Sequence, residues 1–190
     1  MDAQRKDDSV IRELRRYQLA RRLIFHQVRT QTISKLTGLE RNRLAAVRRW
    51  LRVPEDARHR GPPPSSLDVL LRTSRGRTEG AALAALFPLF RKPTAVKPSR
   101  CLDDGEQLCD VYEAYLAYYP QSNMQFEELM LLKRSLAKGD LIELGLCRIC
   151  KGLIMNYRFD RRRCTCWHCE GPNGRDRIVD ASDHSPECFD

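Results

Sequence analysis

Eight cysteines are the residues whose types and spacing most clearly specify chemistry in this chain, and four of them form two matched pairs. Cys147-Arg-Ile-Cys150 and Cys166-Trp-His-Cys169 are both C-x-x-C sequences, and fifteen residues separate them. Each C-x-x-C turns tightly enough to direct both sulfurs to one point, and the segment between them can fold back as a hairpin. This spacing predicts a tetrahedral site that holds one Zn2+ per chain through Cys147, Cys150, Cys166 and Cys169. Because four thiolates leave no position open for water or substrate, the site is structural, and we do not expect an enzyme.

Other assignments of these sulfurs remain open at this point. Cys164 could replace Cys166 and form a less regular C-x4-C with Cys169, and His168 could replace one thiolate. The same cysteines could also form disulfides, which would need an oxidising compartment, or could be buried as small hydrophobic side chains. We favour the two C-x-x-C pairs because two matched knuckles give the simplest geometry.

Two further cysteines belong to a helical stretch, and the start of the chain bears on the compartment. Cys101 and Cys109 are expected to pack in a core. The first residues, Met1 to Asp8, contain no apolar signal segment, so we expect no export and a reducing cytoplasm. A run of eighteen apolar residues is also missing from the sequence, so we expect no membrane partner.

The predicted zinc hairpin is surrounded by cationic side chains. A four-thiolate zinc centre carries a formal charge of about −2, and nearby cations can offset it. The same cations could instead contact phosphates, or they could be a solvated basic surface. They are Arg148, Lys151, Arg158, Arg161, Arg162 and Arg163.

The net charge of +9 is concentrated in the first third of the 190-residue chain. Residues 1–60 hold 16 Lys and Arg against 7 Asp and Glu, whereas residues 61–190 hold 18 of each sign. A local cationic excess of this size is typical of a nucleic-acid-binding region. The alternative is an arginine-rich helical surface that is merely solvated.

The basic region contains the pattern of a helix-turn-helix. Apolar residues at helical spacing predict a first helix over about residues 9–28, and a short helix, a turn at Gly38 and a second helix follow within 30–51. The second helix would lie in the major groove of double-stranded DNA and read bases with its first residues. The candidates for base contacts are Arg41, Asn42 and Arg43, and those for phosphate contacts are Arg48, Arg49 and Arg52. An ordinary helical hairpin with solvated arginines is the alternative.

Beyond the basic region, the sequence predicts a mainly α protein. A proline-rich connector at 61–66 precedes helical segments, in which Gly76 and Gly80 weaken the middle of one helix and Pro88 bends or ends it. Helices are expected over 102–119 and from about 123 to 138, and a short strand over 140–146 leads into the hairpin. The tyrosines of 102–119 are expected to form core or a partner interface, with a base-stacking surface as the alternative. We therefore expect a basic helical DNA-binding region at 1–60, a helical body at 61–140, a zinc-binding hairpin at 141–172 and a disordered acidic tail at 173–190.

The order of these motifs is similar to that of a known family. The relevant segments are Gln18-Leu-Ala, Leu36-Thr-Gly-Leu-Glu-Arg-Asn-Arg-Leu44, Arg60-Gly-Pro-Pro-Pro64, Leu146-Cys-Arg-Ile-Cys-Lys-Gly152 and Cys166-Trp-His-Cys-Glu-Gly-Pro172. Together they resemble the FlhC family, the C subunit of the flagellar master transcriptional activator, over roughly residues 10–172. The chain departs from the family pattern in the extra thiol of Cys164 and in its acidic tail.

The resemblance implies a specific function. FlhC-type proteins act in the cytoplasm in a hetero-oligomer, a hexamer built with the FlhD subunit, which binds promoters of flagellar operons and activates transcription with RNA polymerase. The family's four zinc ligands carry over onto Cys147, Cys150, Cys166 and Cys169. From a different class, the residues also allow a zinc-stabilised interaction scaffold whose N-terminal helices bind a partner protein instead of DNA.

Overall fold

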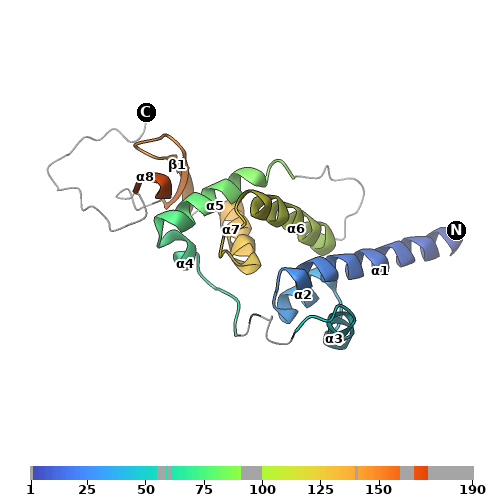
Figure 1. Cartoon of the computed structure of the whole chain (residues 1–190). Coiled ribbons are helices and arrows are strands. Elements are labelled where there is room, and N and C mark those ends of the chain that lie inside the picture. Colours follow the sequence, from blue (N-terminus) through green and yellow to red (C-terminus); the bar gives the residue numbers. More distant parts are fainter. Residues whose placement is uncertain are drawn as a thin grey trace. The chain divides into compact units, whose positions relative to one another are not determined.

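A computed structural model describes residues 2–54, 59, 61–90, 100–139, 141–158 and 165–170, without the side chains of 2–7, 69 and 100. The described chain is mainly helical and contains one small antiparallel sheet, as the sequence predicted (Figure 1). None of the described helices has the length and apolar composition needed to cross a membrane. The elements are α1 (Asp2–Phe25), α2 (Thr30–Thr37), α3 (Arg41–Trp50), α4 (Asp68–Leu71), α5 (Ser74–Leu86), α6 (Arg100–Tyr118), α7 (Phe126–Lys138), β1 (Ile142–Leu146), β2 (Leu153–Tyr157) and α8 (Trp167–Glu170).

The chain forms two compact units, and each unit combines two segments that are distant in the sequence. The first unit comprises Met1–Ser65 and Leu86–Met130, and the second comprises Ser66–Ala85 and Leu131–Asp190. The acidic tail lies outside the described residues, and the four consecutive ranges expected from the sequence stay a prediction.

The core of the first unit lies where α1, α2 and α6 meet. Leu19 and Leu23 of α1 and Ile33 of α2 are fully buried. Gly105 allows α6 to approach α1 closely, because a Cβ at this position would lie 2.7 Å from the Leu19 Cδ2 atom. The tyrosines within α6 and directly after it differ in burial. Tyr112 and Tyr115 are buried in the core, whereas Tyr118 and Tyr119 are exposed.

A repeated ion-pair ladder joins α1 to α6. The Arg15 guanidinium donates to Asp103 and Glu106, and seven residues later Arg22 donates in the same way to Asp110 and Glu113. Because both helices advance by the same seven residues, the ladder fixes them in a parallel register. Burial opposes the charge of Glu113, but hydrogen bonds from Arg22 and His26 outweigh it and lower the pKa of this carboxyl group.

Two helix boundaries in the first unit differ from those expected. The first helix begins at Asp2 and ends at Phe25, instead of running over about 9–28. Its end is set by Gln27, which has a φ of 57°, while the Gln27 and Val28 amides donate back to the Ile24 and Leu23 carbonyls. This is a Schellman termination, which usually has glycine in the left-handed position, so the sequence carried no glycine to mark it.

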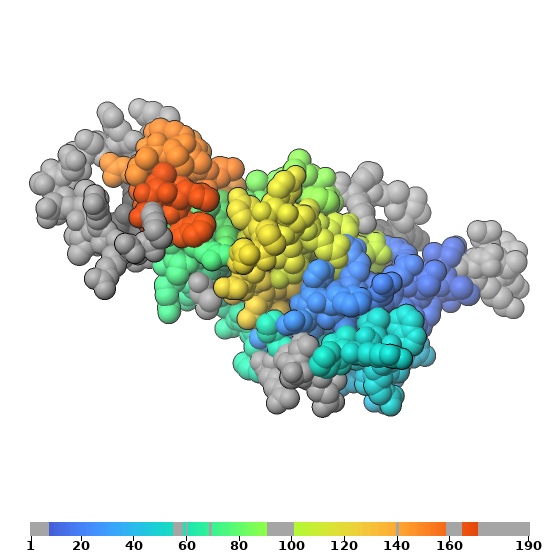
Figure 2. Space-filling model, viewed as in Figure 1, coloured from blue at the N-terminus to red at the C-terminus, as the bar shows by residue number. Residues whose placement is uncertain are grey.

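The second unit is built around α5 and the hairpin of β1 and β2. The strands pair with Leu146 opposite Leu153 and Ile142 opposite Tyr157. Figure 2 shows the hairpin and α8, coloured orange to red, against α4 and α5 in green. The Tyr157 hydroxyl donates to the Asp68 carboxylate and so ties β2 to α4.

Gly76 and Gly80 do not weaken α5 as the sequence suggested, because both lie in contact with neighbouring elements. A Cβ at Gly76 would lie 1.9 Å from the Leu70 carbonyl oxygen, and one at Gly80 would lie 3.2 Å from Leu70 Cδ2 and 3.3 Å from Met155 Sδ. The glycines therefore allow α4 and β2 to pack closely on α5. The helix continues to Leu86, two residues before Pro88.

Candidate metal centre and nucleic-acid interface

The first cysteine knuckle forms at the turn of the hairpin. The Cys147 amide donates to the Gly152 carbonyl over 2.8 Å, and the Lys151 amide donates to the Cys147 carbonyl over 2.9 Å. Lys151 has a φ of 60°, and this left-handed turn brings the Gly152 amide to 3.4 Å from the Cys150 sulfur. A side chain at Gly152 would crowd that sulfur at 3.3 Å, so the residues after the C-x-x-C shape the knuckle as well.

The second knuckle forms at the start of α8. The amides of Cys169 and Glu170 both donate to the Cys166 carbonyl, at 3.0 and 3.1 Å. The Cys166 amide donates to the Cys147 sulfur over 3.3 Å, which joins the two knuckles. Cys147, Cys166 and Ile154 form a small buried core, against which Cys169 packs.

The four predicted ligands converge on one point. The sulfurs of Cys147, Cys150, Cys166 and Cys169 all lie within 4.8 Å of one another, and those of Cys150 and Cys166 are 3.5 Å apart. A tetrahedral site with metal–sulfur bonds of 2.3 Å would require separations of about 3.8 Å. The cluster is therefore of the size and composition that could hold a metal ion. The six described cysteines are free thiols, so no disulfide joins them.

The ionisation of the cluster also fits a bound cation. Burial opposes the ionisation of Cys147, but backbone amides that donate to its sulfur outweigh this effect and lower its pKa to about 6. Burial and contact with the other thiols raise the pKa of Cys169 to about 12, and burial is also the main reason that the pKa of Cys166 is raised. Since the sulfurs resist simultaneous ionisation, a divalent cation would supply the charge that stabilises four thiolates together.

The second knuckle is docked on α5, which sequence reasoning did not identify as part of the site. The Trp167 amide donates to the Thr78 hydroxyl over 3.2 Å, and the Arg75 guanidinium lies 5.3 Å from the centre of the Trp167 ring. Arg77, 4% exposed, approaches the Glu170 carboxylate at 3.6 Å. The signal in the sequence was the polar first half of α5, Ser74-Arg-Gly-Arg-Thr-Glu79, which precedes its apolar second half.

The structure also bears on the alternative ligands, the nearby cations and the two cysteines outside the cluster. His168 is exposed and does not belong to the sulfur cluster. Cys164 and Arg161 to Arg163 lie outside the described residues. Cys109 is buried as expected, and burial raises its pKa to about 12, whereas Cys101 is exposed and the expectation that it packs in the core was wrong.

The helix-turn-helix forms where the sequence placed it, in the first unit. Gly38 has a φ of 71°, and its amide donates to the Ser34 carbonyl, which ends α2. The turn is reinforced by the Ser34 hydroxyl, which donates to the Leu39 carbonyl over 2.8 Å, and by the Leu39 amide, which donates to the Thr37 hydroxyl over 3.2 Å. Leu44 then anchors α3 in the core, where it is completely buried.

Five of the six residues predicted to contact DNA are exposed. They are Arg41, Asn42, Arg43, Arg49 and Arg52. Figure 2 shows α3, in cyan, on the outer surface beside α1 and α2 in blue. Arg48 differs: it is 3% exposed and donates to the Val28 carbonyl over 3.1 Å. Its position is one turn from the buried Leu44, so it faces inward, and the prediction of a phosphate contact by Arg48 does not agree with this burial.

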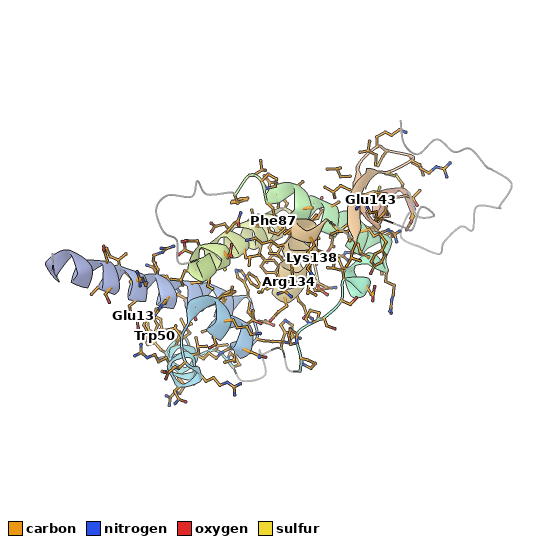
Figure 3. All side chains as sticks on the ribbon, turned by 180° about the vertical axis from the view of Figure 1, so that it is seen from behind. Glu13, Trp50, Phe87, Arg134, Lys138 and Glu143 are labelled. Atoms are coloured by element: carbon orange, nitrogen blue, oxygen red, sulfur yellow. The ribbon has the colours of Figure 1, made fainter. Side chains whose placement is uncertain are left out.

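Three of the exposed residues of α3 lie on one face that α1 does not engage through a described hydrogen bond. Arg43 is held against α1, where it donates to Glu13 over 2.6 Å. Asn42, Ala46 and Arg49, by contrast, are all exposed and follow each other at the i, i+4, i+7 spacing of a single helical face. Trp50, 75% exposed, lies beside this face, and Figure 3 shows it on α3 together with Glu13 of α1. We call Asn42, Ala46 and Arg49 the outer face of α3.

Comparison with known proteins gives no match, either to a protein-family model or to a curated protein.

Proposed function

We propose that the cysteine cluster binds one zinc ion per chain and that this ion holds the second unit together. The observation that carries the proposal is the convergence of four sulfurs from two C-x-x-C knuckles within 4.8 Å. Four thiolates in tetrahedral reach favour zinc among the common divalent ions, and their closed arrangement is that of a structural site.

Metal analysis of the purified, reduced protein tests this proposal. We expect one zinc per chain. We expect the Cys147→Ser variant to bind no zinc, and its second unit should no longer unfold in a cooperative transition. Cys101→Ser is the matched control, because this exposed thiol is not part of the cluster. Zinc-free protein with unchanged stability, or equal zinc content in both variants, would refute the proposal.

We also propose that the first unit binds double-stranded DNA with α3 in the major groove. The observation that carries this second proposal is the outer face of α3, which presents Asn42, Ala46 and Arg49 next to the cationic side chains of Arg41 and Arg52. Asparagine pairs with adenine, arginine pairs with guanine, and a small alanine side chain can contact the thymine methyl group. Arg41, at the start of α3, and Arg52, two residues after its end, are suited to phosphates. The roles of Arg41 and Arg49 are thus exchanged relative to those expected from the sequence, where Arg41 was a candidate for a base and Arg49 for a phosphate.

Selection of preferred DNA sites by the wild-type protein and its variants tests the DNA proposal. Asn42→Ala and Arg49→Ala should each relax the preference at one base position by about 5- to 100-fold. Arg41→Ala should weaken binding to all sequences and reduce the slope of log affinity against log salt by about 1. Arg134→Ala, which removes an exposed arginine of α7, is the control for loss of charge alone. If none of the α3 variants differs from the control, α3 is not the DNA-binding element.

From the resemblance of its motifs, we further propose that the chain acts as an FlhC-type subunit. In this role it would assemble with an FlhD-type subunit, bind flagellar promoters in the cytoplasm and activate transcription with RNA polymerase. Its support is the order of a basic helix-turn-helix and a C-terminal cluster of four cysteines in one chain. Copurification with an FlhD-type protein, followed by footprinting on a flagellar promoter, tests the assignment, and a complex that leaves the promoter unprotected would contradict it.

A further inference from the structure

The helix α1 carries a second apolar stripe on the side that faces away from the core. Ile11, Leu14 and Phe25 are 56%, 57% and 58% exposed, and Val10 beside them is 67% exposed. Together with Gln18 and Arg21, they occupy positions 11, 14, 18, 21 and 25, the alternating three- and four-residue spacing of a coiled-coil seam. The buried residues Leu19 and Leu23 lie on the opposite side of the helix. We call the residues at these five positions the outer stripe of α1.

The two ends of the outer stripe have complementary shapes. At the N-terminal end of the stripe, the aliphatic side chains of Ile11 and Leu14 are exposed. The helix α1 itself extends past the other helices of its unit (Figure 1). At the other end, beside Phe25, a hollow of about 500 Å³ opens between α1 and α6. Its walls are Gln18, Leu19, Arg21, Arg22, Phe25, His26, Glu106 and Glu113.

Charge is also distributed unevenly around the stripe. Arg21 lies within it, exposed, with its guanidinium 5.7 Å from the centre of the Phe25 ring. On the adjoining side of α6, the ladder brings four carboxylates next to two arginines and His26, so acidic side chains outnumber basic ones there. A surface that carries both an exposed cationic side chain and an acidic margin is complementary to itself.

We propose that the outer stripe of α1 binds the same stripe of a second copy of this chain, with the two α1 helices antiparallel. With Gln18 on the twofold axis, Ile11 of each copy lies opposite Phe25 of the other and can enter its hollow. Arg21 then lies opposite Leu14 of the second copy and near the acidic margin of that copy's α6. A parallel pairing would instead place the two Arg21 side chains against each other.

The second copy is favoured over an unrelated partner because one patch holds both the projecting side chains and the hollow. In an isologous interface, the projecting side chains of each copy fill the hollow of the other, and no binding surface is left for a third copy. This inference goes beyond DNA binding and concerns a different face of the first unit.

Sedimentation of the full-length, zinc-loaded protein without DNA tests the dimer. We expect a concentration-dependent dimer, and we expect Ile11→Lys to raise its dissociation constant at least tenfold while the helical circular dichroism is unchanged. Leu89→Lys is the matched control, because Leu89 is 76% exposed but lies outside α1 and outside both cysteine knuckles. A chain that stays monomeric at every concentration, or a dimer that both variants affect equally, would overturn the proposal.

Cysteine cross-linking tests the antiparallel orientation. Ile11→Cys protein mixed with Phe25→Cys protein should form an intermolecular disulfide, identified by mass spectrometry of the linked peptides. Each variant carries only one of the two new cysteines, and positions 11 and 25 are about 21 Å apart on one helix, so this disulfide can form only between two chains. Cross-linking of Ile11→Cys only to itself would refute the antiparallel arrangement. Dimers that appear only with a different protein would assign the stripe to that protein, and a failure of DNA binding would leave these outcomes unaffected.

Discussion

The contact between α4 and α5 offers a sharp test of how the second unit supports its metal centre. Gly76→Ala would place a Cβ 1.9 Å from the Leu70 carbonyl oxygen and 2.9 Å from its carbonyl carbon. An ordinary carbon–oxygen contact is about 3.3 Å, so the backbone of α4 must move by more than 1 Å. Overpacking of this kind costs about 3 kcal/mol at the upper end of its range, and the better helix propensity of alanine returns at most about 1 kcal/mol.

We therefore expect Gly76→Ala to lower the free energy of unfolding by about 2 kcal/mol and Tm by roughly 4–8 °C. Gly80→Ala is the matched control, because its Cβ would contact only the flexible ends of the Leu70 and Met155 side chains, at 3.2 and 3.3 Å. The gain in helix propensity and the mild crowding of Gly80→Ala should nearly cancel, so its free energy of unfolding should stay close to that of the wild type. Thermal unfolding followed through tryptophan fluorescence and zinc release measures both variants. If Gly76→Ala is as stable as Gly80→Ala, the close approach of α4 and α5 is not a constraint in solution.

Three further substitutions probe the ladder, the docking of the second knuckle and the inward face of α3. The pKa of Glu113 is lowered in the folded state, so its stabilisation is present above the unfolded value of about 4.3 and is lost as the pH falls through the folded value. Glu113→Gln should consequently flatten the fall of Tm between about pH 5 and pH 3, and an unchanged slope would contradict this. Arg77→Ala, which removes the buried partner of Glu170, should speed zinc transfer to a colorimetric chelator several-fold at constant zinc stoichiometry. Arg48→Met should lower the free energy of unfolding by about 1–3 kcal/mol in urea titrations, because the Val28 carbonyl loses its donor, while the salt dependence of DNA binding stays unchanged.

The sequence predicted best the features that depend on local chemistry. The cysteine ligands could be found because thiols at C-x-x-C spacing specify a geometry within a few residues, and the four sulfurs do converge. The turn between α2 and α3 could be found because Gly38 marks the left-handed position directly. The end of α1 could not, because Gln27 adopts the same conformation without the glycine that usually indicates it.

Features set by tertiary contacts were harder to predict from the sequence. A glycine inside a helical pattern indicates weakness when it is read alone, yet Gly76 is required by the closeness of the Leu70 carbonyl group, and Gly80 lies against the Leu70 and Met155 side chains. Arginine is usually a surface residue, and only the one-turn spacing of Arg48 from Leu44 indicated that it faces the core. Each of these residues has a partner far away in the sequence or on another element, which periodicity within one segment does not reveal.

The same distinction explains why the metal centre is more than its four ligands. The knuckles determine which sulfurs meet, but α5 determines where the second knuckle lies, through the Thr78 hydroxyl and the contacts of Arg75 and Arg77. Those three residues come from a segment about ninety positions before Trp167, so ligand binding and the packing of α5 are coupled. A zinc ion would therefore stabilise α5 together with the hairpin, and a substitution in α5 should weaken zinc binding without removing any ligand.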